Sequence, residues 1–185
     1  MLSVEATALP DVKIIQPRKF GDHRGFFSEV YNRQAFAAAG IALEFVQDNH
    51  SLSGAVGTLR GLHFQSPPFA QDKLVRVTHG RILDIAVDIR RSSPTFGQHV
   101  SIELSRENWR QMLVPAGFAH GFVTLEPDTE VIYKVTSLYS AADDHGLAFD
   151  DPALQIDWML SHDGLTLSDK DRTHPRLADL PRYFD

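Results

Sequence analysis

The sequence predicts an all-β domain, a jelly-roll barrel or sandwich with a few short helices. Short strand-like runs follow one another through the middle of the chain, turn residues separate them, and a single segment has the clear pattern of a helix. The 185 residues match the length of one domain, 1–185, in which a C-terminal tail from about residue 160 would pack on the barrel.

The strand-like segments are 12–15, 26–31, 45–49, 73–78, 81–90, 100–104, 111–114, 121–125 and 130–135. In the segment 81–90, aliphatic residues alternate with Asp84, Ala86 and Asp88, so one face is apolar and the other carries two carboxylates. The segments 73–78 and 81–90 flank the dipeptide His79-Gly80, which predicts a hairpin closed by a tight turn.

One helix is predicted between strands. Asn32 is a favourable N-cap, the run RQAFAAA that follows is a strong helix former, and Gly40 stands where a C-cap glycine belongs. A second helical segment is expected to begin at Ser168, in the sequence SDKDR.

Composition excludes several classes of function. The chain has no cysteine, which removes disulfides, thiolate nucleophiles and cysteine metal sites. Its 18 basic and 24 acidic residues give a net charge of −6 without a basic stripe, so we expect no nucleic-acid partner. The stretch Ala35–Leu43 is too short to span a membrane, and the N-terminus lacks the basic region of a signal peptide. We therefore expect a soluble, cytoplasmic protein.

Four segments carry more polar residues than a strand framework needs: GDHRGFFSE (21–29), QDNHS (47–51), LRGLHFQ (59–65) and VPAGFAHGF (114–122). Alternation in 59–65 would put Arg60 on one face, and Gly61 and His63 on the other. A glycine beside His63 leaves room for a ligand. Taken alone, however, a single histidine is more often a hydrogen-bonded structural residue.

A metal site is not expected. The segment Pro115–His120 has the proline–glycine–histidine spacing of the second motif of cupins, a family of jelly-roll barrels. Metal-binding cupins usually also supply His-x-His and a nearby Glu. Here the matching stretch is His63-Phe64-Gln65, and no Glu follows before Glu103, which makes a poor divalent site.

Acid–base chemistry suits the remaining polar residues, because the sequence lacks the phosphate-binding, dinucleotide and serine-hydrolase motifs. A histidine oriented by a carboxylate is a competent base, Tyr133 could return a proton, and Lys73 could stabilise charge on a carbonyl oxygen. Each also has a structural explanation: Tyr133 as a lining aromatic, Lys73 as a solvated strand end, and Asp171 as part of a capping box with Ser168. The residues alone predict a barrel with a polar, histidine-containing cavity and no particular substrate.

Seven motifs, in order along the chain, resemble the dTDP-4-dehydrorhamnose 3,5-epimerase family: FGDHRGFFSE, VQDNHSLS, LRGLHFQ, AQDKLVRV, DIAVDIRRSSPTFG, VPAGFAHGF and YKVTSLYS. The resemblance implies a cupin-type jelly roll and a homodimer that exchanges N-terminal strands, without metal or organic cofactor. It also implies a reaction, the inversion of C3 and C5 of dTDP-4-dehydro-6-deoxy-glucose through an enolate, giving dTDP-4-dehydro-L-rhamnose.

The same resemblance implies roles for individual residues. His63 is similar to the family's proton-abstracting base, Asp171 to the carboxylate that orients it, and Tyr133 to the acid on the opposite face. Lys73 would face the C4 oxygen, and Asp84 would pair with His120. The implied substrate contacts are Arg24, Glu29, Gln47, Asp48, Asn49, Arg60, Lys73, His120, Asp144 and Lys170.

Two positions depart from the family's usual pattern. Asp144 stands where the family usually has Glu, and Thr58 where an aliphatic residue is usual. Tyr139 is a second candidate for the acid. A related 3-epimerase or ketoisomerase on a similar substrate and a non-catalytic sugar-binding cupin are the alternative functions.

Overall fold

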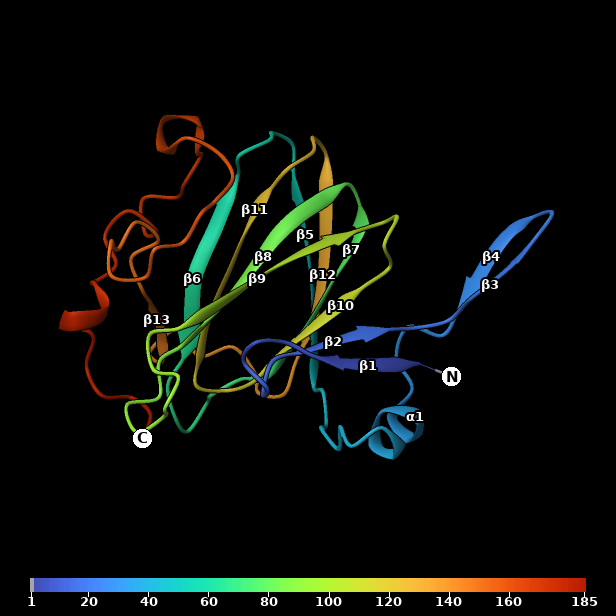
Figure 1. The fold of residues 1–185 in the computed structure, drawn as a ribbon, viewed down its shortest axis with the longest axis horizontal. Coiled ribbons are helices and arrows are strands. Elements are labelled where there is room, and N and C mark those ends of the chain that lie inside the picture. The colour runs from blue at the N-terminus through green and yellow to red at the C-terminus, as the bar shows by residue number, and fades with distance from the viewer. Residues whose placement is uncertain (1) are drawn as a thin grey trace.

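Two antiparallel sheets form a sandwich in the computed structural model, which describes residues 2–185 (Figure 1). In spatial order, the first sheet contains β1 (Ser3–Ala6), β2 (Lys13–Gln16), β10 (Gln111–Val114), β7 (Lys73–His79), β12 (Thr129–Val135) and β5 (Gln47–Ser53). The second contains β13 (Asp144–Gly146), β6 (Leu59–Gln65), β11 (Phe118–Thr124), β8 (Arg81–Asp88) and β9 (His99–Ser105). The predicted all-β, jelly-roll fold class is confirmed.

A separate hairpin, β3 (Lys19–Asp22) and β4 (Gly25–Ser28), extends away from the sandwich (Figure 1). The helix α1 (Arg33–Ala38) follows it and begins as predicted, since the Asn32 side chain accepts hydrogen bonds from the backbone N–H groups of Gln34 and Ala35. Two short 3₁₀ helices, η1 (His162–Gly164) and η2 (Leu177–Asp179), lie in the C-terminal segment.

The hairpin predicted around His79-Gly80 is wrong. β7 pairs with β10 and β12 in the first sheet, whereas β8 pairs with β9 and β11 in the second. The turn therefore carries the chain from one sheet to the other. A tight turn between two apolar strands fits a hairpin and a crossover equally well, so local sequence could not distinguish them.

The expected helix at Ser168 is also absent. Residues 169–172 form turns instead, and the Ser168 hydroxyl accepts a hydrogen bond from the backbone N–H of Asp171 at 3.2 Å. The capping interaction is thus present without a helix behind it, because the chain soon reaches Pro175, which a helix interior does not tolerate.

Both faces of the second sheet are buried. Val77, Ile82 and Met112 belong to the apolar cluster between the two sheets. On the outer face, Ile85 packs in a second cluster with residues of the C-terminal segment, among them Trp158. The C-terminal segment therefore covers one sheet and approaches the strands that carry the polar residues. No helix within residues 2–185 has the length and apolar character that a membrane span requires.

Candidate active site

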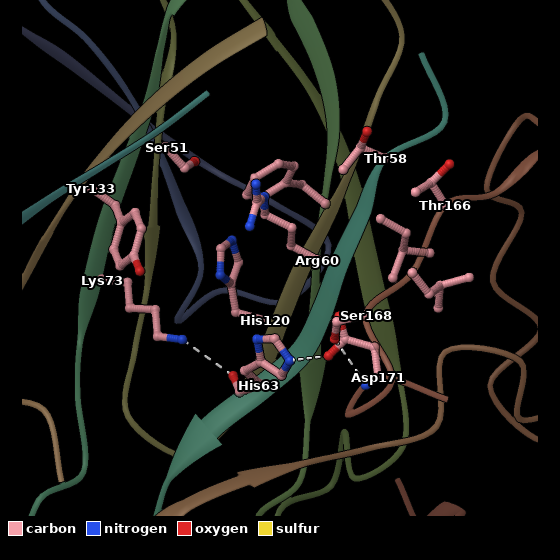
Figure 2. Close-up of a pocket in the computed structure, with 13 residues that line it drawn as sticks. Ser51, Thr58, Arg60, His63, Lys73, His120, Tyr133, Thr166, Ser168 and Asp171 are labelled. Atoms are coloured by element: carbon pink, nitrogen blue, oxygen red, sulfur yellow. Dashed lines mark hydrogen bonds and ion pairs between the residues drawn. The ribbon is translucent and has the colours of Figure 1, made fainter. Parts of the chain in front are cut away.

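A cavity of about 420 Å³ lies between strands of both sheets and the C-terminal segment (Figure 2). Its polar lining includes Arg60, His63, Lys73, His120, Tyr133 and Asp171. β6 and β11 of the second sheet supply the histidines, β7 and β12 of the first sheet supply the lysine and the tyrosine, and a C-terminal turn supplies the aspartate. The four residues predicted as catalytic are thus brought together.

His63 and Asp171 form a tight pair. The Nε2–H of His63 donates to Oδ1 of Asp171 at 2.5 Å, and the Asp171 side chain is only 4% exposed. This bond fixes the tautomer, so Nδ1 keeps its lone pair and turns toward the cavity (Figure 2). The capping interaction with Ser168 is present as well, because the backbone N–H of Asp171 donates to the Ser168 hydroxyl while the carboxylate accepts from His63.

The surroundings keep this pair poised as a neutral imidazole beside a carboxylate anion. Burial lowers the pKa of His63 below its ordinary value, and Asp171 partly opposes that shift. Burial would raise the pKa of Asp171, but the contact with His174 and the hydrogen bonds from His63 and Ser168 outweigh it and hold that pKa well below the usual range. A neutral histidine with a free nitrogen facing a cavity can accept a proton.

Tyr133 and Lys73 supply protons and charge from the other sheet. Burial raises the pKa of Tyr133 above its ordinary value, so its phenol is protonated at neutral pH. Lys73 donates from Nζ to the backbone oxygen of His63 at 3.2 Å, and burial lowers its pKa to about 8. Both groups can therefore give a proton or a hydrogen bond to a molecule in the cavity.

A second histidine–aspartate pair lies deeper. Nε2 of His120 and Oδ1 of Asp84 are 2.7 Å apart, and the Asp84 side chain is fully buried. Burial raises the pKa of Asp84, while the contact with His120 opposes the rise. The pairing expected from the resemblance is present, and it holds the His120 ring at the cavity wall.

Arg60 and His63 share the cavity, contrary to simple alternation along β6. In the pairing with β11, His120 is opposite His63 but Phe122 is opposite Arg60, which is a β-bulge that adds one residue to β6. Gly61 makes this possible, because a Cβ there would lie 2.5 Å from the Cα of Gly121. The bulge turns both polar side chains to one face.

An adjoining cavity of about 220 Å³ shares His63, Lys73 and Tyr133 with the first. It also contains the predicted contacts Gln47, Asn49, Asp144 and Lys170. On its wall Asp144 receives hydrogen bonds from Tyr139 at 3.1 Å and from Lys170 at 2.5 Å. Tyr139 lies largely exposed at this rim, whereas Tyr133 lines both cavities.

Three predicted contacts lie outside both cavities. Arg24 is at the tip of the β3–β4 hairpin, ion-paired with Asp22. Glu29 lines a separate depression near α1. Asp48 points away from the cavity because alternate residues of β5 face opposite sides of the sheet, and it is ion-paired with Lys134 at 2.8 Å.

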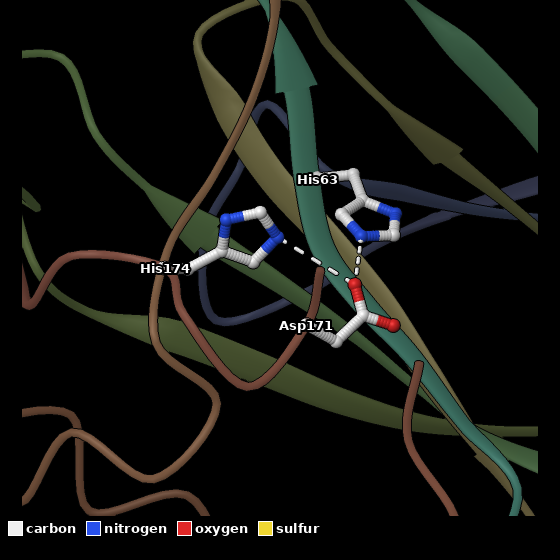
Figure 3. Close-up of side chains that lie close together, drawn as sticks. All are labelled: His63, Asp171 and His174. Carbon is white, nitrogen blue, oxygen red and sulfur yellow. Dashed lines mark hydrogen bonds and ion pairs between the residues drawn. The ribbon is translucent and has the colours of Figure 1, made fainter. Parts of the chain in front are cut away.

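Sequence reasoning missed Ser51 and Thr166, which line the main cavity. It also missed His174, which contacts Asp171. His63, Asp171 and His174 have potential metal-ligand atoms within 4.8 Å of one another (Figure 3). Both histidines, however, direct Nε2 to the same carboxylate oxygen. Ligand atoms of a tetrahedral site with bonds of about 2 Å lie about 3.3 Å apart, so the 2.5 Å contact between His63 and Asp171 is too short for such a site. The contact between His63 and Asp171 is instead a hydrogen bond.

Comparisons with known proteins agree on one family. The family model described as dTDP-4-dehydrorhamnose 3,5-epimerase matches residues 6–179. A curated protein of that name from Sinorhizobium fredii is 53% identical, over 97% of this chain and 92% of its own. The crystal structure of the Bacillus anthracis protein of that name, with TDP and PPi bound, superposes with a TM-score of 0.92 at 49% identity and covers 95% of this chain and 99% of its own.

A second solved structure carries a sugar nucleotide. It is dTDP-6-deoxy-D-glucose-3,5-epimerase from Legionella pneumophila in complex with dTDP-4-keto-L-rhamnose, with a TM-score of 0.93 at 43% identity. The match covers 98% of this chain and 95% of that one.

Proposed function

The chain belongs to the dTDP-4-dehydrorhamnose 3,5-epimerase family, and we propose that the cavity between its two sheets is where it carries out that family's reaction. The enzyme is an isomerase that inverts C3 and C5 of dTDP-4-dehydro-6-deoxy-glucose to give dTDP-4-dehydro-L-rhamnose. The observation that carries the site assignment is the meeting of His63, Asp171 and Tyr133 around one cavity.

His63 is the base. The hydrogens on C3 and C5 both lie next to the C4 ketone, so removing either one gives an enolate with its charge on the same oxygen. Nδ1 of His63 accepts the proton, and the imidazolium that forms is stabilised by the carboxylate of Asp171. Lys73, which contacts the His63 backbone, supplies positive charge for the enolate oxygen.

Tyr133 is the acid. Inversion requires that a proton leaves one face of the carbon and another arrives on the opposite face. His63 and Tyr133 belong to different sheets and line the same cavity, which supports their action from two sides of a bound sugar. The raised pKa of Tyr133 keeps its phenolic proton available at neutral pH.

Cations near the cavity suit a diphosphate. Arg60 lines the main cavity and Lys170 the adjoining one, and both can bind phosphate oxygens despite the net charge of −6. Gln47 and Asn49 add neutral polar contacts in the adjoining cavity. Asp144, which is one methylene shorter than the Glu usual in the family, holds Lys170 and Tyr139 together at the rim.

The N-terminal hairpin supports a homodimer. Phe20, Phe26 and Phe27 are exposed on it, Phe27 at 69%, and an exposed aromatic group of this kind marks an interaction surface. Arg24 and Glu29 lie on or beside the hairpin, away from the cavity of their own chain. The proposal is that the N-terminal strands are exchanged between two copies and that Arg24 and Glu29 complete the partner's cavity. We also propose that the enzyme works in the cytoplasm.

Proton NMR in deuterated water tests the proposed function. The purified protein, incubated with dTDP-4-dehydro-6-deoxy-glucose, should exchange the hydrogens on both C3 and C5 for deuterium and give the L-rhamno product. Exchange at C3 alone would instead identify a 3-epimerase. Binding of the sugar nucleotide without any exchange would identify a non-catalytic binding protein.

A further inference from the structure

A second histidine, His174, also lies against the carboxylate of Asp171 (Figure 3). Nε2 of His174 lies 3.5 Å from Oδ1 of Asp171, the same oxygen that accepts the hydrogen bond from His63. The two imidazole rings meet edge to face, with centroids 5.5 Å apart and an angle of 80°. At 3.5 Å the contact is long for a hydrogen bond, but hydrogen bonds of catalytic groups often tighten once substrate is bound.

His174 has no competing partner. Its side chain is 8% exposed, and Nε2 makes no hydrogen bond to any other group within residues 2–185. A buried ring nitrogen without a partner costs free energy, so its orientation toward Asp171 needs an explanation. The nearest group that can satisfy it is the carboxylate that already serves His63.

A slot in the sheet holds the His174 ring in this place. Gly146 of β13 is paired with His63 of β6, and a Cβ at Gly146 would overlap the imidazole of His174. The sheet position beside the base is therefore occupied by the ring of His174 rather than by a side chain of β13. This arrangement couples the two histidines through neighbouring strands as well as through Asp171.

We propose that His174 is a positioning residue for the epimerisation, donating a second hydrogen bond to Asp171 and thereby fixing the carboxylate that orients His63. The inference rests on the proposed function of the His63–Asp171 pair. Removal of His174 leaves Oδ1 with one donor, so the carboxylate gains rotational freedom and bonds His63 more strongly. The first effect slows catalysis, and the second makes His63 easier to protonate.

The pH dependence isolates this role from general damage to the fold. His174 packs against the His63 ring. The other charged or titratable groups that line the two cavities with His63 are Asp171 and Lys170 of the C-terminal segment, Arg60 of β6, Lys73 of β7, His120 of β11, Tyr133 of β12, Tyr139, and Asp144 of β13. Among these groups, His174 directs its Nε2 only to Asp171, so its loss acts on His63 through that carboxylate. An upward shift of the acidic limb of the kcat/KM profile then reports a stronger His63–Asp171 bond.

His174→Ala and His174→Gln form the matched pair of variants. In His174→Ala, kcat should fall about tenfold with little change in KM, the loss of one hydrogen bond to a charged group. The acidic limb of kcat/KM should move up by about one pH unit. The amide N–H₂ of His174→Gln should restore most of the rate and return the limb toward the wild-type position. If the acidic decline of kcat/KM occurs at the same pH in His174→Ala as in the wild type, the proposal is overturned.

Gly146→Ala tests the same link without changing His174. The added methyl group should displace the imidazole and reproduce the slower kcat and the shifted limb. In Gly146→Ala/His174→Ala the methyl group has room, so its effect should disappear relative to His174→Ala alone. Additive losses in the double variant would contradict the coupling. If the wild-type enzyme exchanges no substrate hydrogen for solvent deuterium, the proposed function itself is overturned.

Discussion

His63 and Tyr133 line one cavity from opposite sheets of the sandwich, the histidine on β6 and the tyrosine on β12. They are 70 residues apart in the sequence, and the jelly-roll topology places their strands on two walls of the main cavity. A sugar ring bound between these walls would present one face to each residue. That relationship is the geometric requirement for inversion by a base and an acid.

Replacing the base should stop exchange at both carbons. His63→Ala should lower solvent-deuterium incorporation at C3 and C5 by about a thousandfold or more, because it removes the imidazole that Asp171 orients toward the substrate. Nucleotide binding, measured by calorimetry with dTDP, should stay nearly unchanged. His50→Ala is the matched control, since His50 is hydrogen-bonded to Glu130 on the face of β5 turned away from the cavity. Undiminished exchange in His63→Ala would remove His63 from the mechanism.

Replacing the acid should separate exchange from inversion. Tyr133→Phe should still lose hydrogen to solvent, because His63 can abstract it, while net inversion slows about a hundredfold. Tyr139→Phe should invert at close to the wild-type rate, since Tyr139 is exposed at the rim and bonded to Asp144. Measuring product formation and deuterium content in the same NMR series checks both variants. The opposite pattern would assign the acid to Tyr139.

The orienting carboxylate should matter almost as much as the base. In Asp171→Asn the amide can donate to Nε2, which favours the tautomer with the proton on Nδ1, the nitrogen that must accept. We expect kcat to fall by about three to four orders of magnitude with little change in dTDP affinity. Asp169→Asn, two residues away in the same turn, is the control and should behave as wild type. Equal activity of the two variants would contradict the role of Asp171.

The plot of kcat/KM against pH should fall at low pH and at high pH, and a different residue should cause each decline. His63 must be neutral to accept a proton, and its pKa lies below the ordinary 6.5, so kcat/KM should fall only when the pH drops below that value. Lys73 must be protonated to stabilise the enolate, and its pKa of about 8 predicts a decline above about pH 8. Lys73→Gln should be slower overall and should lose that basic limb. A basic limb that persists in Lys73→Gln would belong to another group.

Local patterns predicted much of the fold. The segment 111–114 is a strand with the predicted bounds, Asn32 caps the helix it was expected to cap, and the β class followed from the turn spacing. Patterns failed where tertiary context decides. The turn at His79-Gly80 carries the chain between sheets, and the bulge at Gly61 reverses the face of Arg60, because both depend on strands distant in sequence.

The site was predictable only in part for the same reason. No local pattern links His63 to Asp171, whose carboxylate comes from a turn 108 residues later. The family resemblance supplied that pair, and the structure has the two residues in contact. It could not supply His174, which contacts Asp171 and whose ring fills the space that Gly146 leaves beside His63. Arg24 and Glu29, two of the implied substrate contacts, lie away from the cavity of their own chain.

The most direct measurement is a crystal structure of the enzyme with dTDP-4-dehydro-L-rhamnose bound. The account predicts that Nδ1 of His63 lies within about 3.5 Å of C3 or C5 on one face of the sugar ring, with the hydroxyl of Tyr133 on the other. A sugar with both residues on the same face, or one bound outside the cavity between the sheets, would contradict it.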